Sequence, residues 1–167
     1  MTHEQHAGSA AAGETVIAVV PNATLMKGFL GTGSRLHALV ITAKRVLFAR
    51  TTTQMLKAIT AEARDAAKAE GKGFFGQWGA QMGAQGILAA RYFDMSPDDI
   101  LAEHPANFAI ERDSIVKARL KIGAAGDQNM AASTDQLIIK TTGKKYKVQL
   151  GSGAKQAREA LIEAEMI

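Results

Sequence analysis

The chain has 167 residues, contains no cysteine and carries a formal net charge of +4. This length suits a single hydrophobic core, since domains commonly have about 100–200 residues. The lack of cysteine excludes disulfides, thiolate zinc sites and cysteine nucleophiles, and it is compatible with a reducing compartment.

The positive charge is unevenly distributed along the chain. Residues 14–52 carry five basic and one acidic side chain, and residues 107–150 carry eight basic and four acidic ones. Residues 53–106, between them, carry five basic and seven acidic side chains. The basic excess of the two outer parts favours anionic partners such as lipid headgroups, nucleic acid or acidic protein, or else belongs to ordinary solvated faces.

Residues 1–13 are mostly small or polar, so they cannot bury enough apolar surface to offset the entropy of ordering them. We predict a flexible tail over residues 1–13 and one domain over residues 14–167. The tail has neither the basic start nor the apolar run of a signal peptide. We therefore expect a cytoplasmic protein, either free or peripheral at the inner face of the membrane.

Short runs of β-branched and aliphatic residues predict three strands in the first basic part of the chain. The strands span about Thr15–Val20, with or without a continuation through Leu25–Met26, then Arg35–Ile41 and Arg45–Ala49. Thr42–Lys44 is short enough to be a tight connection between the last two strands. An antiparallel meander is expected.

Residues 53–106 are rich in alanine and charge, and their apolar residues recur at helical spacing. This spacing predicts a first helix and, over Phe74–Phe93, a second one. The dipeptide Ser96-Pro97 is typical of a helix start, so a short third helix is expected through Glu103. Together these helices predict a helical hairpin inserted between strands.

The strand pattern returns after Pro105 and predicts four strands that end at Leu150. Thr142–Lys144 lies between two strand-like runs and predicts a hairpin. Ser152 is placed to cap a final helix. The apolar face of that helix is formed by Ala154, Ala157, Leu161 and Ala164.

Two segments resemble parts of a known family. The segment GSRLHALVITAKRVLFAR at residues 33–50 is similar to the glycine, strand, threonine and basic strand of GRAM and bacterial pleckstrin-homology-like (PH-like) domains. The segment NFAIERDSIVKARLK at residues 107–121 is similar to their run of strand, turn, isoleucine and strand. The order of three strands, four strands and a closing helix also matches that fold.

The resemblance implies a mainly β (α+β) fold, namely a PH-like bent antiparallel barrel of about seven strands with a C-terminal capping helix. The helical hairpin at residues 53–106 would interrupt this barrel. The resemblance further implies a non-enzymatic module without a cofactor that recognises phospholipid headgroups or protein segments.

The loop between the first two strands is the anion site that the resemblance implies. Lipid-binding relatives carry three basic positions there, and Lys27, Arg35 and His37 stand at similar places, with histidine replacing the expected arginine. Lys27 and Arg35 suit phosphate by their charge. Phe29 and Leu30 at the loop tip either enter a bilayer interface or cover the mouth of the barrel, and the second alternative is favoured.

A second basic cluster lies on the predicted hairpin and consists of Lys140, Lys144, Lys145 and Lys147. Lys140 and Lys147 are expected on the same side of the hairpin. The cluster either binds anions or prevents an exposed strand edge from pairing with other chains, and the second alternative is favoured.

The segment Phe74–Phe93 holds five of the nine aromatic residues of the chain. Its glycines, at spacings of three, four and three, are Gly76, Gly79, Gly83 and Gly86. On a helix they form one narrow face that lets another backbone approach closely. This face either packs against the preceding helix, which is slightly favoured, or assembles a homo-oligomer.

Catalysis finds little support in the sequence. His3 and His6 have a ligand-like spacing but lie in the predicted tail, and His104 has no carboxylate and nucleophile as partners. We therefore expect no catalytic residue, no metal and no cofactor. The remaining hypotheses are, in order, recognition of an anionic phospholipid surface or a protein partner, self-association through the glycine face, and nucleic-acid binding.

Overall fold

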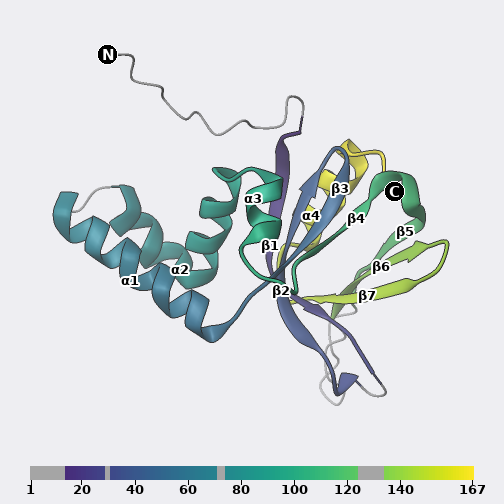
Figure 1. Cartoon of the computed structure of the whole chain (residues 1–167), viewed down its shortest axis with the longest axis horizontal. Helices are drawn as coiled ribbons and strands as arrows, with labels where there is room; N and C mark the ends of the chain where they lie inside the picture. Colours follow the sequence, from purple (N-terminus) through teal and green to yellow (C-terminus); the bar gives the residue numbers. More distant parts are fainter. Residues whose placement is uncertain (1–13, 29–30, 71–73, 124–133) are drawn as a thin grey trace.

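The computed structural model describes residues 14–28, 31–70, 74–123 and 134–167. They form a bent, open antiparallel barrel that a C-terminal helix caps, and a helical arm projects from one side of it (Figure 1). Phe29 and Leu30, the predicted loop tip, lie outside the described residues, as do His3 and His6.

Seven strands form one sheet in the order β4-β3-β2-β1-β7-β6-β5. They are β1 (Val16–Leu25), β2 (Arg35–Thr42), β3 (Arg45–Arg50), β4 (Phe108–Glu111), β5 (Ile115–Lys121), β6 (Asp135–Thr141) and β7 (Lys145–Leu150). All neighbouring strands are antiparallel, which confirms the predicted meander and hairpin. β1 continues through Pro21 because its register with β2 shifts between Val20 and Ala23, so the missing N–H of the proline is tolerated there.

The inner face of the barrel holds the main core. Its largest fully buried side chains include Leu39, Ile41, Phe48, Leu137, Ile139 and Leu150. Helix α4 (Ala154–Glu163) buries Ala157, Ala160 and Leu161 against this core, since these residues lie three or four positions apart on one helix face. The predicted capping helix and its apolar face are confirmed.

The predicted cap of this helix was wrong. Gly153 and not Ser152 occupies the N-cap position, with φ 80° and no side-chain hydrogen bond to the helix. A Cβ atom at Gly153 would lie 3.1 Å from Cγ1 of Val20, in addition to the strain of a positive φ. Glycine therefore allows the tight turn from β7 into α4 against β1.

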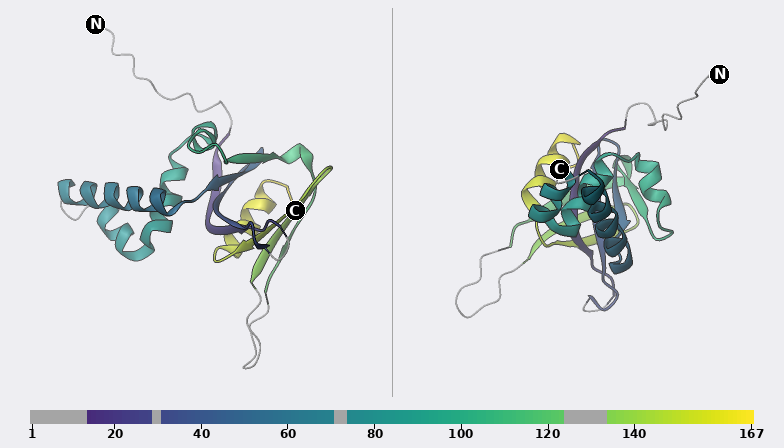
Figure 2. Two further views of the ribbon diagram at one scale, coloured as in Figure 1. Left: turned by 60° about the horizontal axis from the view of Figure 1, so that its bottom comes forward. Right: turned by 90° about the vertical axis from the view of Figure 1, so that its left-hand side faces the viewer.

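The inserted helices cover the outer face of β1, β2 and β3. They are α1 (Thr53–Glu70), α2 (Phe74–Phe93) and α3 (Pro97–Ala102). Ile59 of α1, Leu88 and Tyr92 of α2 and Ile100 of α3 form a second core with sheet residues that point outward, among them Val19, Val40 and Leu47. The arm of α1 and α2 reaches beyond this contact, away from the barrel (Figure 2). The third helix begins as predicted, because the Ser96 side chain accepts a hydrogen bond from the Asp99 N–H.

Helix α2 is not continuous, which corrects the predicted glycine face. Gly83 has φ 63° and ψ −170°, so two helical segments meet there at a kink. A Cβ atom added at Gly83 would have nothing within 4 Å, so no backbone of the described residues lies against it. The kink rotates Gly86 relative to Gly76 and Gly79, whose surroundings lie outside the described part of the chain.

Gly83→Ala is expected to destabilise the protein by about 1–2 kcal/mol, because residues with a side chain avoid this positive φ. Urea unfolding followed by circular dichroism measures the loss. Gly143→Ala is the control, since Gly143 has no positive φ and open space around it. Equal stability of the two variants would contradict a strained kink at Gly83.

A partly buried ion pair joins the segment before β1 to the barrel and to α3. The Arg45 guanidinium donates from Nε to Glu14 Oε1 at 2.8 Å and from Nη2 to Glu14 Oε2 at 2.9 Å. Nη2 also lies 2.7 Å from Asp98 Oδ1. Thr42 donates its hydroxyl to Glu14 at 2.8 Å, so the β2–β3 turn is held by the same carboxylate.

Candidate anion-binding site

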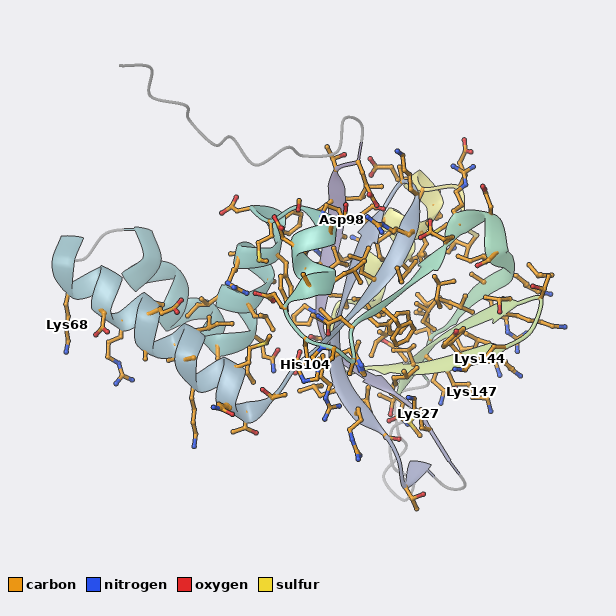
Figure 3. The ribbon with its side chains drawn as sticks, viewed as in Figure 1. Lys27, Lys68, Asp98, His104, Lys144 and Lys147 are labelled. Carbon is orange, nitrogen blue, oxygen red and sulfur yellow. The ribbon has the colours of Figure 1, made fainter. Side chains whose placement is uncertain are left out.

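A pocket of about 400 Å³ lies between the end of β1, the start of β4 and the start of β7. Its lining comprises Leu25, Met26, Lys27, Phe108, Ala109, Lys144, Lys145 and Tyr146. Three of these eight residues are lysines and none is acidic. Lys27 and Lys144 lie on the same side of the barrel, remote from Lys68 on the helical arm (Figure 3).

Aromatic side chains form the wall beneath these lysines. The rings of Phe48 and Phe108 stack with centroids 4.6 Å apart, because these residues are direct partners on β3 and β4. The ring centroids of Tyr146 and Phe108 are 5.8 Å apart, and the Lys144 ammonium is 5.0 Å from the Tyr146 ring centroid. The aromatic wall therefore holds one of the pocket cations by a cation–π contact.

His37 is buried beside this wall, with only 4 % of its surface exposed. Its ring meets Phe48 and Phe108 edge to face at 6.1 and 6.4 Å. Nδ1 lies 3.0 Å from the carbonyl oxygen of Arg35, and this nitrogen donates to it in the neutral ring. His37 thus forms part of the barrel interior next to the pocket.

Burial lowers the pKa of His37 below its ordinary value of 6.5, although the hydrogen bond to Arg35 opposes this change. The positive charges of Arg50 and Lys27, with a smaller contribution from His104, lower the pKa further. His37 is therefore neutral at pH 7. The cations Lys27, just after β1, and Arg50, at the end of β3, both act on it, so the local potential favours an anion.

Arg50 is a site residue that the sequence patterns did not identify. It ends β3 directly opposite His37 on β2, and both face the barrel interior. Its Nη1 atom is buried, and no hydrogen-bond acceptor for it is found among the described residues. The pairing of β2 with β3 brings Arg50 beside His37. No local motif around Arg50 predicts this position.

The three predicted loop residues do not meet at one point. Lys27 lines the pocket, and His37 is not part of the lining but contacts the ring of Phe108, which is. Arg35, by contrast, is exposed at the start of β2 and donates from Nη1 to the Ser34 carbonyl at 3.0 Å. The structure brings Lys27 and His37 together with Arg50, whereas Arg35 stays outside the pocket lining.

The hairpin lysines border two surfaces, and Lys145 belongs to both. Lys144 and Lys145 line the pocket, while Lys140, Lys145 and Lys147 are exposed on the outer face of the sheet. Lys140 pairs with Lys145, and Lys147 lies two positions beyond Lys145 on the same face, so Lys140 and Lys147 share one side as expected. Protection of a strand edge does not explain Lys140, which is paired on both sides, with Lys117 and Lys145. It stays an alternative for Lys145, because β1 pairs with β7 only over Val148–Leu150.

In the ranges that the structure describes, no helix has the length and apolar character needed to cross a membrane. Within the same ranges no three side chains of His, Asp or Glu gather as metal ligands do. His104 accepts a hydrogen bond at Nδ1 from the Ala106 N–H at 3.0 Å.

No protein-family model matches the chain, and no curated protein matches it significantly. Among solved structures, the chain is similar to the C-terminal domain of an unknown protein from Leishmania infantum, with 16 % identical residues and a TM-score of 0.45. The similarity covers 92 % of this chain and 85 % of the Leishmania chain. A likeness of this degree carries no argument about function.

Proposed function

We propose that this chain is a non-enzymatic recognition domain that binds the phosphate of an anionic phospholipid headgroup. The observation that carries the proposal is the pocket between β1, β4 and β7, where Lys27, Lys144 and Lys145 surround an aromatic wall without a carboxylate. A volume of about 400 Å³ lies within the range of small-ligand pockets.

The unpaired cationic groups support an anionic ligand. A buried guanidinium nitrogen without an acceptor is costly, and a phosphate oxygen is a suitable acceptor for it. Arg50 Nη1 is such a nitrogen, and Arg50 pairs with His37 on the neighbouring strand, behind the residues that line the pocket. Burial is the main cause of the lowered pKa of His37, and Arg50 and Lys27 lower it further; an anion beside these two cations would offset only this smaller contribution.

The sequence resemblance supports the same ligand class. We further propose that the chain is a divergent PH-like domain, with its anion site at the barrel end that also holds the β1–β2 and β6–β7 connections. The protein partner that the resemblance equally implied is the alternative. A protein partner would leave vesicle binding absent.

Vesicle co-sedimentation tests the proposal. The double variant Lys27→Gln/Lys144→Gln is expected to bind phosphatidylinositol-phosphate vesicles about 30-fold more weakly, since each lysine near an anionic surface contributes about 1 kcal/mol. The control Lys57→Gln/Lys68→Gln removes the same charge from exposed positions of α1 and should bind like the unmodified protein. Calorimetry with soluble inositol phosphate separates a headgroup from a general surface effect.

Failure of the unmodified protein to bind any anionic vesicle would exclude the lipid proposal. Equal loss in the pocket variant and the arm control would exclude the pocket as the site. Binding of vesicles without binding of the soluble headgroup would assign the attraction to surface charge alone.

A headgroup in this pocket is expected to raise the pKa of His37, because the added negative charge stabilises the imidazolium. Without ligand, His37 has a lower pKa in the folded protein than in the unfolded chain. As pH falls below 6.5, the unfolded chain binds a proton at His37 before the folded protein does, so folding stability declines. With ligand, affinity should increase as pH falls from 7. Nitrogen-resolved NMR titration, assigned with His37→Gln, measures both pKa values. An unchanged pKa at saturation would place the phosphate elsewhere.

A further inference from the structure

The outer face of β5, β6 and β7 is an ordered array of cations. Cross-strand pairing aligns three rows, which are Lys117–Lys140–Lys145, Arg119–Ile138–Lys147 and Lys121–Gln136–Gln149. Six of these nine positions are cationic, and none is acidic. All six cations are exposed, as expected for alternate residues whose neighbours Ala118, Leu120, Leu137, Ile139, Tyr146 and Val148 face the core. We call this surface the basic sheet face.

The basic sheet face is not neutralised within the part of the chain that the structure describes. None of its six cations takes part in the ion pairs found there. Lysines directly opposite one another on neighbouring strands destabilise a sheet, and Lys117, Lys140 and Lys145 form two such pairs in succession. Six of the nine positions, and three of the six cations, lie on β6 and β7 and not on the edge strand β5. Protection of that edge therefore does not account for the whole face.

The charge increases toward the pocket. The three rows hold three, two and one cation, and the densest row contains Lys145, which also lines the pocket. In Figure 3, Lys147 of the basic sheet face lies next to Lys144 at the pocket rim. The face and the pocket are therefore one continuous positive surface that turns around the start of β7.

We propose that the basic sheet face lies against the same anionic membrane whose headgroup enters the pocket, so that the domain docks tilted toward β5, β6 and β7. The proposal rests on the proposed function and adds the docking orientation to it. The pocket supplies headgroup selectivity, and the basic sheet face supplies adsorption to any anionic lipid.

A membrane is the partner that the face suits best. Its nine positions span about 10 Å across the strands and about 13 Å along them, which exceeds one headgroup. Anionic lipids diffuse laterally and can gather beneath cations at any spacing, within a Debye length of about 8–10 Å. A single-stranded nucleic acid would gain from aromatic stacking, and the nine positions include no aromatic residue. The buried Ile138 at the centre offers no anchor for a protein partner either.

The first test compares binding of the full chain to phosphatidylcholine vesicles with and without phosphatidylserine. Lys117→Gln/Lys140→Gln is expected to weaken binding to phosphatidylserine vesicles about 30-fold, and high salt should abolish it. The control Lys57→Gln/Lys68→Gln has the same net charge and should retain binding. Lys27→Gln/Lys144→Gln should lose preference for phosphatidylinositol phosphate over phosphatidylserine while its binding of soluble inositol phosphate also fails.

The tilt itself is tested by two single variants on one strand. Lys117 and Lys121 are both exposed on β5, in the row nearest to the pocket and in the row farthest from it. Lys117→Gln is expected to weaken phosphatidylserine binding about fivefold and Lys121→Gln less than twofold. Circular dichroism confirms that both variants are folded, as exposed lysines allow.

Three results would overturn the proposal. Equal binding of phosphatidylserine vesicles by Lys117→Gln/Lys140→Gln and the arm control would show that the basic sheet face does not contact the membrane. Equal effects of Lys117→Gln and Lys121→Gln would exclude the tilt. Tighter binding of a single-stranded polynucleotide than of vesicles, lost on substitution of Lys117 and Lys140, would assign the face to nucleic acid. A failure of the pocket proposal alone gives a different result. The protein would then not bind soluble inositol phosphate but would still bind phosphatidylserine vesicles.

Discussion

Leu88→Ala is expected to destabilise the whole domain by about 3 kcal/mol, within the range for large-to-small changes in a core. Leu88 is fully buried and lies in the second core between α2 and the outward residues of β1, β2 and β3. The cavity would form between the insertion and the sheet, so both should unfold in one transition. Guanidinium unfolding followed by far-ultraviolet circular dichroism measures the free energy of unfolding.

Phe93→Ala is the matched control for Leu88→Ala, because Phe93 belongs to the same helix and is 46 % exposed. Its substitution should change the free energy of unfolding by less than about 0.5 kcal/mol. If Leu88→Ala lost helical signal at low denaturant while the barrel unfolded at its original midpoint, the insertion would be an independent appendage and not part of the domain.

Arg45→Gln is expected to cost about 3 kcal/mol at pH 7, since it leaves the Glu14 carboxylate buried without its charged partner. The Glu14 side chain is 6 % exposed and that of Arg45 is 15 % exposed. The control is Arg112→Gln, because Arg112 pairs with Glu165 in a surface ion pair, where a loss of at most about 0.5 kcal/mol is expected.

The cost of Arg45→Gln should decrease as pH falls. Burial alone would raise the pKa of Glu14, but the hydrogen bonds from Arg45 and Thr42 and the attraction to Arg45 bring it below its ordinary value of 4.5. The ion pair therefore stabilises the unmodified protein above pH 4.5, and this stability is lost as pH falls through the lower folded pKa. Without Arg45, burial raises the pKa of Glu14. As pH falls, Glu14 of the variant is therefore protonated at a higher pH than in the unmodified protein, which removes the cost of its unpaired charge. A constant difference between pH 7 and pH 4 would contradict this account.

The sequence alone determined the elements of the fold. Runs of β-branched and aliphatic residues placed the strands, and helical spacing placed the inserted helices. The third helix began where Ser96 and Pro97 predicted it. The apolar face of α4 followed from helical spacing. The predicted N-cap and the predicted glycine face were wrong at Gly153 and Gly83, where the backbone has a positive φ. A glycine in the sequence does not by itself show that the chain adopts this conformation.

Only the tertiary structure decided which charges act together. Lys27 and Lys144 are far apart in the sequence and border one pocket, and Arg50 joins His37 through the register of β2 and β3. The six cations of the basic sheet face belong to three strands, and each strand taken alone shows only ordinary solvated lysines and arginines. Periodicity is a local property that the order of residues encodes directly, whereas the sites depend on strand pairing, and strand pairing is set by packing between distant segments.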